Sequence, residues 1–329
     1  MRADTSSEKL PLIVLAGPTA VGKTGLSLKL AKAVGGSVIS ADSMQVYRGL
    51  DIGSAKLPAE ERQGIEHYLI DVAEPEESFD VVRFQEMAEE AVRAICRKGR
   101  LPVLTGGTGF YIQALTRGVD FSESSGSSGI RERWTQTAER EGPEAVHAAL
   151  AAVDPDAAAA IHPHNIRRVV RALEFYEQTG GPISLHNLEQ KRHPSPYRLA
   201  YFVLTDDREI LYRNIDRRVA EMMEAGLEEE VRRLRQRGLT EEHPSMKGIG
   251  YREFFPYFRG EYDLEETVRL IRRNTRHYAK RQLTWFRREP EAVFLDRREY
   301  GRDDDRILRA ILEQLRQRGI LRQQKEGTA

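Results

Sequence analysis

The chain carries Gly17-Pro18-Thr19-Ala20-Val21-Gly22-Lys23-Thr24, a stretch that decides the fold. It matches the phosphate-loop pattern G-x-x-x-x-G-K-S/T at every fixed position. Residues 12–16 before it are apolar and predict a buried strand, and the leucines after it predict a helix that ends near Gly35. Backbone N–H groups at the start of such a helix bind phosphate, with Lys23 over the outer phosphate and the Thr24 hydroxyl on Mg²⁺. The alternative is a glycine-rich turn without a ligand.

Length and composition fit one large domain plus a smaller one, since 40% of the 329 residues are hydrophobic. Lysine plus arginine and aspartate plus glutamate both total 51, so net charge alone predicts no nucleic-acid partner. The charges are nevertheless segregated along the chain. Residues 59–90 hold eleven acids and two bases, whereas residues 267–288 hold eight bases and no acid. Such segregation predicts strong local fields on a neutral protein.

The single cysteine, Cys96, excludes an intrachain disulfide and any cysteine-rich zinc site, and its place in an amphipathic helix predicts a packing role. No apolar run reaches the roughly 18 residues of a membrane span. Residues 1–10 lack the apolar core of a signal peptide. We therefore expect a cytoplasmic protein that contacts no membrane.

Short apolar runs recur along the chain and predict further strands. Residues 37–40 and 101–105 have the character of buried strands, and a helical pattern at residues 79–97 separates them. Residues 199–204 resume the sheet, and residues 292–295 predict a last strand. This alternation predicts an α/β fold, in which a parallel sheet of the phosphate-loop type is flanked by helices and binds ligands at the carboxyl ends of its strands.

A change in composition divides the chain. Residues 122–129 are a Ser/Gly-rich, low-complexity run, and residues 130–180 are rich in Ala, Glu and Arg with helical periodicity. We therefore predict an all-helical insertion domain at residues 120–196. It interrupts the α/β core, which comprises residues 1–119 and 197–329.

Two loops at the predicted sheet edge carry candidate chemistry. Asp42 directly follows the second strand, where a carboxylate can ligate Mg²⁺ or act as a general base. The alternative is a cap or turn residue whose side chain bonds the backbone. Thr108 lies in a glycine-rich turn and is a candidate helix N-cap. Because the carboxyl ends of parallel strands meet at one edge, both loops should converge with the phosphate loop on one crevice.

Two predicted helices carry arginine on one face. Residues 165–174 bring Arg168 and Arg171 together, a pattern that most often marks a solvated face. Residues 264–288 present an apolar stripe flanked by eight Arg and Lys side chains. Because residues 267–288 hold no acid to pair with these cations, we favour binding to a phosphate backbone over a plain solvated face.

In combination, these features resemble the tRNA dimethylallyltransferases (tRNA isopentenyltransferases) over nearly the whole chain. Seven segments carry the resemblance in the order of the family. They are G-P-T-A-V-G-K-T at 17–24, D-S-M-Q-V-Y-R-G-L-D-I-G-S-A-K at 42–56, H-Y-L-I-D at 67–71, G-G-T-G-F-Y at 106–111, R-V-V-R-A-L-E at 168–174, K-G-I-G-Y-R-E at 247–253 and K-R-Q-L-T-W-F-R at 280–287. The phosphate loop alone occurs in many enzymes, whereas the ordered set is specific.

The resemblance implies an enzyme that moves a dimethylallyl group from dimethylallyl diphosphate to the exocyclic amine of a tRNA adenosine, the one just 3′ of the anticodon. Residues 17–24 would hold the diphosphate of this donor, not ATP, together with Mg²⁺. Asp42 becomes the general base on the adenine amine, and Thr108 lies at the reaction centre. Lys23 and Arg218 become the catalytic cations.

One departure from the family concerns its R-I-x-x-R pattern. Arg218 fits the second arginine, whereas Asn214 stands at the first. Arg213 is therefore the candidate that replaces the missing cation at the diphosphate. A second departure is the Ser/Gly run at residues 122–129, which replaces a usually Pro-rich segment.

The resemblance also assigns contacts with the anticodon stem-loop of tRNA. They are Asp42, Ser43, Met44, Gln45, Thr108, Arg131, Arg167, Arg168, Arg171, Lys247, Gly248, Ile249, Gly250, Tyr251, Arg252, Arg273, Arg276, Lys280 and Arg281. A monomer is expected. One alternative is a kinase that uses ATP in the same loop, which leaves the cationic helix unexplained. Another is a non-enzymatic RNA-binding protein, which the intact Lys23 and Thr24 argue against.

Overall fold

The computed structural model describes residues 9–119, 128–192 and 194–321. Contacts between Cα atoms divide the chain into two compact units. Unit 1 comprises residues 1–116 and 196–329, and unit 2 comprises residues 117–195. The predicted domain boundaries lie within a few residues of this division. The Ser/Gly run, apart from its last two residues, lies outside the described part of the chain.

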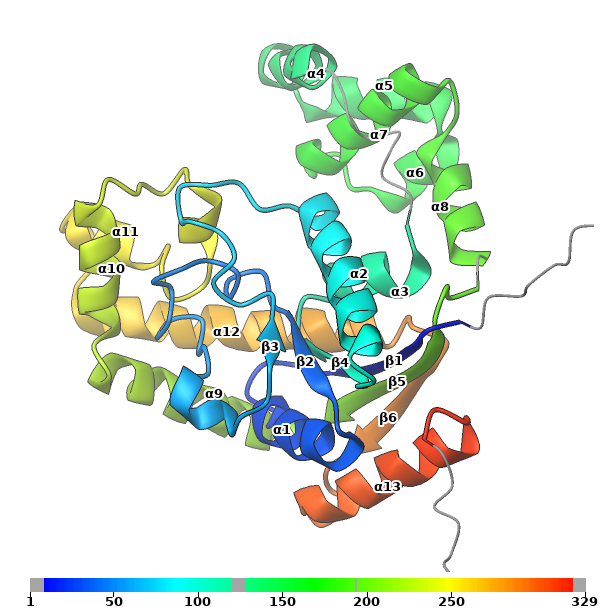
Figure 1. The fold of residues 1–329 in the computed structure, drawn as a ribbon. Coiled ribbons are helices and arrows are strands. Elements are labelled where there is room, and N and C mark those ends of the chain that lie inside the picture. Colours follow the sequence, from blue (N-terminus) through cyan, green and yellow to red (C-terminus); the bar gives the residue numbers. More distant parts are fainter. Residues whose placement is uncertain (1–8, 120–127, 193, 322–329) are drawn as a thin grey trace, which may run out of the picture. The chain divides into compact units, whose positions relative to one another are not determined.

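Unit 1 is built on a six-stranded parallel sheet in the order β3-β2-β4-β1-β5-β6 (Figure 1). The strands are β1 (Pro11–Ala16), β2 (Ser37–Ala41), β3 (His67–Tyr68), β4 (Pro102–Gly106), β5 (Arg198–Thr205) and β6 (Ala292–Asp296). All five predicted strands are present and pair in parallel, which confirms the α/β class. The sequence did not reveal β3, because two residues are too short to show the alternation of a strand.

Helices connect the strands of unit 1. They are α1 (Lys23–Val34), α2 (Val81–Arg97), α3 (Gly109–Arg117), α9 (Arg208–Glu224), α10 (Leu227–Gln236), α11 (Phe254–Phe258), α12 (Leu264–Phe286) and α13 (Asp304–Gln317), with short 3₁₀ turns η1 (Ala59–Arg62) and η3 (Pro244–Lys247). Asp80, Asp207, Asp263 and Asp303 each cap the following helix by accepting a backbone N–H bond. These caps satisfy amide groups that have no partner inside the helix.

The described residues of unit 2 form helices without a strand. The helices are α4 (Ser128–Glu141), α5 (Pro143–Val153), α6 (Pro155–Ala160), α7 (Ile166–Thr179) and α8 (Ile183–Arg192). Val169, Val170 and Leu173 of α7 are buried in a separate core with Val146 and Leu150 of α5. Unit 2 therefore has a hydrophobic core of its own.

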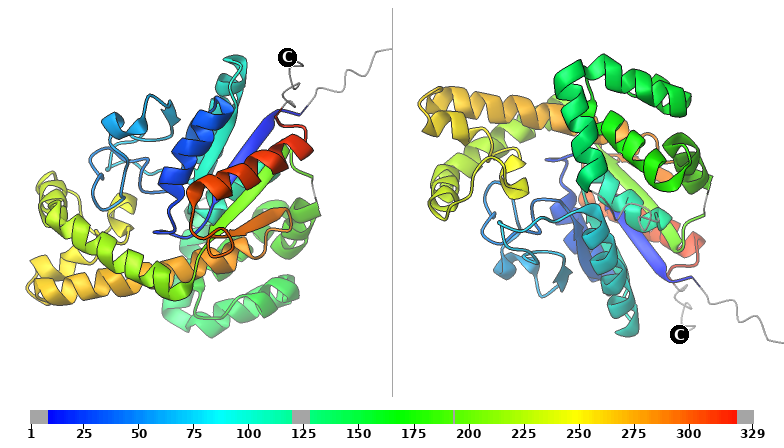
Figure 2. Two further views of the ribbon diagram at one scale, coloured as in Figure 1. Left: turned by 90° about the horizontal axis from the view of Figure 1, so that it is seen from below. Right: turned by 90° about the horizontal axis from the view of Figure 1, so that it is seen from above.

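The core of unit 1 lies on both faces of the sheet, because side chains alternate along a strand. Leu12 and Val14 of β1 join a buried cluster with α2, α3, α9 and α12. Ile13 and Leu15 join a second cluster with α1 and α13. The views in Figure 2 show α1 and α13 along one face of the sheet. A strand buried on both sides explains why β1 appears in the sequence as a continuous apolar run.

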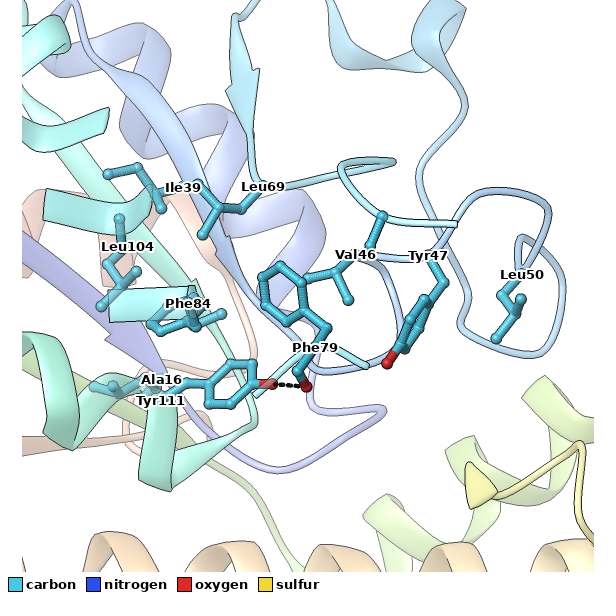
Figure 3. Close-up of a cluster of buried hydrophobic side chains, with 14 of the residues drawn as sticks. Ala16, Ile39, Val46, Tyr47, Leu50, Leu69, Phe79, Phe84, Leu104 and Tyr111 are labelled. Carbon is cyan, nitrogen blue, oxygen red and sulfur yellow. Dashed lines mark hydrogen bonds between the residues drawn. The ribbon is translucent and has the colours of Figure 1, made fainter. Parts of the chain in front are cut away.

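An aromatic stack joins α2 to α3 in the first cluster (Figure 3). Phe84 of α2 is fully buried, and its ring lies on that of Tyr111 with centroids 4.3 Å apart. The Tyr111 hydroxyl donates to the Phe79 carbonyl oxygen at 3.4 Å. The ring stays in the core while its polar end is satisfied. This stack fixes the start of α3, which directly follows the loop that carries Thr108.

We expect Phe84→Ala to lower the free energy of unfolding by about 3–5 kcal/mol, because it leaves a cavity and removes the stack. Urea denaturation followed by circular dichroism measures the change. Leu264→Ala is the control, because Leu264 is 37% exposed; its effect should stay within about 0.5 kcal/mol. A loss below about 1 kcal/mol for Phe84→Ala would contradict the role of the stack.

Candidate active site

The phosphate loop, residues 17–24, joins β1 to the N-terminus of α1. Gly17 and Gly22 have φ angles of +150° and +96°, a region that side chains disfavour. Space is also missing, since a Cβ at Gly17 would lie 2.5 Å from the Leu204 carbonyl oxygen and one at Gly22 would lie 2.9 Å from Arg297 Nη1. The loop therefore requires glycine at both positions, and its backbone leads into a helix N-terminus, the arrangement that binds phosphate.

Two cavities of unit 1 adjoin the loop, with volumes of about 390 Å³ for the first and about 460 Å³ for the second. The phosphate loop and the loops after β2 and β4 all line the first cavity, so they converge as the parallel sheet predicted. Lys23, Thr24 and Arg218 line both cavities. Gly17 and Pro18 begin the loop and line neither. These three shared residues therefore lie at the boundary between the two cavities.

Lys23 is held close to the loop backbone. Its Nζ atom donates to the Pro18 carbonyl oxygen at 2.7 Å. Burial lowers the pKa of Lys23 to about 7, the Arg218 guanidinium acts in the same direction, and the Asp42 carboxylate opposes both. An anion beside the loop would favour the charged form, so Lys23 gains its full charge when such a ligand binds.

Helix α9 places polar side chains against the phosphate loop. Arg218 donates from Nη1 to Thr19 Oγ1 at 3.1 Å, and Asn214 donates from Nδ2 to the Ala20 carbonyl oxygen at 3.3 Å. Burial lowers the pKa of Arg218, and the Asp42 carboxylate opposes this shift. Asn214 thus binds the loop backbone at the position where the family pattern has an arginine.

The assignment of Arg213 to the diphosphate stays a prediction. Its side chain is exposed and lines neither cavity. Arg217, one turn further along α9, lines the second cavity together with Asn214 and Arg218. A helix turns by about 100° per residue, so the face that carries Asn214 and Arg218 includes Arg217 and leaves Arg213 at its margin. Arg217 is therefore an additional cation beside the loop.

Asp42 forms a turn and also faces the first cavity. Its Oδ1 atom accepts from the N–H groups of Met44 at 2.9 Å and Gln45 at 3.4 Å. Asp42, Ser43, Met44 and Gln45 all line the first cavity. The turn interpretation of Asp42 is therefore confirmed, and the role as a general base stays a prediction. The turn fixes the carboxylate in the cavity wall and leaves its second oxygen outside the turn.

Thr108 links the loops after β2 and β4. Its hydroxyl oxygen accepts from the Ser43 N–H at 3.2 Å, and its own N–H donates to the Ala41 carbonyl oxygen at 3.1 Å. Tyr278 of α12 lines the first cavity as well. Burial, reinforced by the Asp42 carboxylate, raises the pKa of Tyr278. Thr108 stands at the predicted N-cap position before α3, yet its hydroxyl bonds the neighbouring loop.

Sequence reasoning did not include Tyr278 and Gln282 in the site, although both line the first cavity. Gln282 accepts from the Thr19 N–H at 2.9 Å and donates to the Gly107 carbonyl oxygen at 2.9 Å. Both residues belong to the stripe of α12, whose helical spacing predicts only packing. The available signal was chemical, because an amide and a phenol in an otherwise apolar stripe need partners.

The segment after η3 also lines the first cavity. Its lining residues are Lys247, Gly248, Ile249, Gly250 and Arg252. Tyr251 is the exception, because it is fully buried and its hydroxyl donates to Glu230 Oε1 at 2.8 Å. Burial and the Glu230 carboxylate raise the pKa of Tyr251. The assignment of Tyr251 as an RNA contact is therefore corrected to a packing role.

Glu230 of α10 holds this wall together although only 2% of it is exposed. Its Oε2 atom accepts from the N–H groups of Asp51 at 3.0 Å and Ile52 at 2.8 Å. Its Oε1 atom accepts from the Gly53 N–H at 3.1 Å and from the Tyr251 hydroxyl. Four hydrogen bonds make burial of the carboxylate tolerable and join residues 51–53 to the segment after η3.

Some cations of α12 have partners, contrary to the expectation from residues 267–288. Arg276 pairs with Asp216 of α9, with 3.1 Å from Nε to Oδ1, and Arg269 pairs with Glu266. The acids were missed because one precedes the counted range and the other lies on a different helix. The exposed cations of the predicted set on this helix are Arg273, Lys280 and Arg281. Of these, Arg281 also lines the first cavity.

In unit 2, the predicted arginines fall into two groups. Arg131 and Arg171 both bind the buried Glu174, at 2.8 Å and 2.9 Å. Arg167 and Arg168 are exposed on α7. Arg131 of α4 and Arg171 of α7 share one buried carboxylate, and this contact fixes the position of α4 against α7. Both arginines therefore have a structural role besides any contact with RNA.

The described residues contain no group of three or more His, Cys, Asp or Glu side chains that could hold a metal ion. Mg²⁺ bound to phosphates commonly uses only one or two protein ligands. The Thr24 hydroxyl lines both cavities and fits that kind of site. In the described parts of the chain, no helix is long and apolar enough to cross a membrane. Cys96 packs on the core of unit 1, and burial raises its pKa.

The fold and the site define a phosphate-loop group-transfer enzyme. The Asp42 carboxylate faces one cavity, and cations line the other. The model of the family described as IPP transferase matches residues 45–289. The chain belongs to this family of tRNA dimethylallyltransferases. This membership does not favour the kinase alternative.

Individual relatives agree over nearly the full length. The tRNA dimethylallyltransferase of Lachnoclostridium phytofermentans is 51% identical over 312 residues, which are 95% of this chain and 99% of the relative. A crystal structure of a tRNA isopentenylpyrophosphate transferase from Bacillus halodurans has a TM-score of 0.71 at 42% identity, and covers 94% of this chain and 98% of that one. A eukaryotic dimethylallyltransferase acting on tRNA has a TM-score of 0.76 at 33% identity, and covers 87% and 73%.

We expect Lys23→Met to make the ligand-free protein more stable, most strongly below pH 7. The folded pKa of about 7 lies below the ordinary 10.5, so the unfolded chain binds more protons between these values and wild-type stability rises with pH there. The advantage of the variant should therefore shrink as pH approaches 10. Chemical denaturation at several pH values measures it.

Lys32→Met, at an exposed position of α1, is the control for loss of a lysine. It should show no such advantage. An advantage of Lys23→Met that is constant with pH would contradict the buried, depressed lysine.

Proposed function

We propose that this enzyme transfers the dimethylallyl group of dimethylallyl diphosphate to the exocyclic amine of the tRNA adenosine 3′-adjacent to the anticodon. One observation carries the proposal: Lys23, Thr24 and Arg218 line both cavities. A donor whose diphosphate lies in the second cavity and whose allyl group reaches the first would pass these three residues. The bond that breaks would then lie beside the cations that stabilise the leaving group.

The second cavity suits a diphosphate because of its charge. Its cationic lining residues are Lys23, Arg217, Arg218, Arg297 and Arg302, and its acidic ones are Asp206 and Glu221. Loop residues 20–24 also line it, at the N-terminus of α1. As the allylic C–O bond breaks, negative charge grows on the diphosphate, and fixed N–H groups and cations stabilise that charge without reorganisation. This arrangement favours the loss of diphosphate.

The first cavity suits the nucleobase and the allyl group. Asp42 and Thr108 belong to loops joined by the Ser43–Thr108 hydrogen bond, so the carboxylate and the hydroxyl lie close together. An aromatic amine is a weak nucleophile, and a carboxylate that accepts its proton assists attack on the allylic carbon. Ile215, Val219 and Ile271 also line the cavity. Such apolar side chains keep water from the reactive allyl group.

Mg²⁺ fits the proposed reaction as a cofactor. Thr24 would hold it, with the diphosphate supplying further oxygen ligands. When bound, the ion would neutralise charge on the leaving diphosphate. Asp42 lines the first cavity together with Thr24.

The proposed tRNA contacts surround the first cavity and extend along the exposed cations. Lys247, Arg252 and Arg281 line the cavity, and all three are exposed. Exposed cations bind backbone phosphates and position the anticodon stem-loop. The adenosine would leave its stack to enter the cavity, as a base must when an enzyme modifies it. A tRNA substrate supports a cytoplasmic location, and we propose that the enzyme acts as a monomer.

The remaining proposed contacts lie on exposed parts of both units. They are Arg167 and Arg168 in unit 2, and Arg273 and Lys280 in unit 1. Arg131, Arg171 and Arg276 are already paired with acids. We therefore expect the exposed group to contribute more to the salt dependence of tRNA binding, because only an unshielded cation fully displaces a counterion.

We expect purified protein with labelled dimethylallyl diphosphate and Mg²⁺ to label tRNA, and Asp42→Asn to lower this rate about 100-fold or more. Asparagine retains a side-chain oxygen for the turn bonds but cannot take the proton. Binding of tRNA, measured by filter retention, should change less than about threefold.

Asp305→Asn is the matched control, since Asp305 is exposed, pairs with Lys29 and lines neither cavity. Its rate should equal that of the wild type. Wild-type protein that leaves tRNA unlabelled while it consumes ATP on a small acceptor would refute the proposed function.

A second comparison tests the diphosphate site. Arg217→Ala should raise the KM for dimethylallyl diphosphate about fivefold, because a charged contact at the second cavity is lost, whereas Arg213→Ala should change it less than twofold. Steady-state kinetics at saturating tRNA measures both. If the two substitutions raise the KM equally, Arg213 belongs to the diphosphate site as much as Arg217 does.

A further inference from the structure

We propose that Gln282 is a positioning residue, which fixes the phosphate loop relative to the loop of Thr108 and thereby sets the distance between the leaving diphosphate and the acceptor amine. The inference rests on the proposed function and adds to it a residue that holds the two reacting partners in register. Gln282 touches backbone, and it acts through Thr19 and Gly107.

The side-chain amide of Gln282 uses both of its ends. Its Oε1 atom accepts from the Thr19 N–H at 2.9 Å, and its Nε2 atom donates to the Gly107 carbonyl oxygen at 2.9 Å. The residue is only 5% exposed. The two partners are 263 and 175 positions away in sequence. One planar amide therefore bridges the loop after β1 and the loop after β4 from a third element, α12.

The loop of residues 106–108 leaves room for the Gln282 side chain and has little freedom to move. A Cβ at Gly107 would lie 2.1 Å from Gln282 Nε2, so glycine there admits the amide. A Cβ at Gly106 would lie 2.2 Å from the Ala41 carbonyl oxygen, and the Thr108 N–H donates to that same oxygen. Close backbone contact on one side and Gln282 on the other hold this loop in place.

Each bridged loop carries groups that act at one end of the transfer. The Thr19 hydroxyl accepts a hydrogen bond from the Arg218 guanidinium, on the side of the proposed diphosphate. Thr108, next to Gly107, accepts from Ser43 beside the proposed base, at the acceptor side. Tyr278, one turn before Gln282 on α12, also lines the first cavity. Helix α12 thus sets the separation of the two reacting ends.

A positioning role predicts a particular kinetic signature. An error of about 1 Å in the approach of two reactants can cost a factor of about 100 in rate without a comparable loss of binding. The binding groups for diphosphate and for tRNA remain in place when Gln282 is changed. The rate of transfer should therefore fall while the KM of the donor and the affinity for tRNA change little.

Loss of register should also let water compete with the amine. In that side reaction, a water oxygen attacks the allylic carbon, the C–O bond to diphosphate breaks, and the water proton passes to solvent. The products are dimethylallyl alcohol and diphosphate. A residue that only stabilises the fold would lower the amount of active enzyme without changing the share of donor lost in this way.

Two variants test the proposal with labelled dimethylallyl diphosphate, Mg²⁺ and tRNA. Gln282→Met keeps length and volume but loses both hydrogen bonds, and Gln282→Glu keeps an acceptor for Thr19 but loses the donor to Gly107. Both should lower kcat about tenfold or more, change the donor KM and the tRNA Kd less than about threefold, and raise the fraction of alcohol. Thr284→Ala, exposed on the same helix, should match the wild type.

A double substitution with Gly107→Ala adds a test that is independent of overall stability. Gly107→Ala alone should displace the Gln282 amide. It should therefore lower kcat as much as a substitution of Gln282 does. In the Gln282→Ala background the added methyl group has space, so the double variant should be no slower than Gln282→Ala. Multiplying losses would overturn the proposal, as would a kcat within twofold of wild type for Gln282→Met.

The outcomes separate this inference from the proposed function. If the wild type labels tRNA and Gln282→Met does so equally fast, the positioning role fails and the function stands. If the wild type does not label tRNA, the function itself fails. If Gln282→Met does not fold, as judged by circular dichroism, Gln282→Glu and the Gly107→Ala pair decide the question with the same readouts.

Discussion

The parallel pairing of β1 with β4 and β5 is the constraint on which the site depends. Ala16 pairs with Gly106 on one side and with Val203 on the other, and Gly106 also pairs with Ala41. The ends of β1, β2, β4 and β5 therefore lie at one level. Four loops leave the sheet together, and polar side chains that are far apart in sequence meet around the phosphate loop. Hydrophobic burial on both faces keeps this level fixed, because a shift along β1 would move apolar side chains out of both clusters.

The cations of this chain differ in whether an acid pairs with them. Cations that hold the fold are paired with acids, as Arg276 is with Asp216 and Arg171 with Glu174. Of the cations beside the phosphate loop, Arg217, Arg297 and Arg302 pair with acids. Burial disfavours the charged form of the other two, Lys23 and Arg218. Lys23 and Arg218 gain most from a bound anion, because the anion supplies an opposite charge that offsets their burial. The same chain thus uses arginine for structure in one place and for ligand binding in another.

The sequence predicted those parts of the structure that local chemistry determines. The phosphate loop, five strands and the positions of Asp42 and Thr108 follow from motifs and apolar runs that are contiguous in the chain. Features that depend on contacts between distant segments were not predictable. Arg217 was not considered because the direction of α9 was unknown, and Tyr251 was taken for an exposed contact because its partner Glu230 lies on another helix. Gln282 was missed for the same reason, since helical spacing does not show which backbone groups a buried amide will meet.

The buried carboxylate of Glu230 limits which sequences this wall of the cavity can accept. A Cβ at Gly53 would lie 2.5 Å from the Tyr251 ring, so a larger residue at position 53 requires loss of the ring at position 251. Loss of that ring would leave Glu230 with an unused acceptor in a dry environment, which favours a change at position 230 as well. The packing therefore couples positions 53, 230 and 251. Two buried residues behind the cavity wall, Glu230 and Tyr251, thus restrict which residue can line it at position 53.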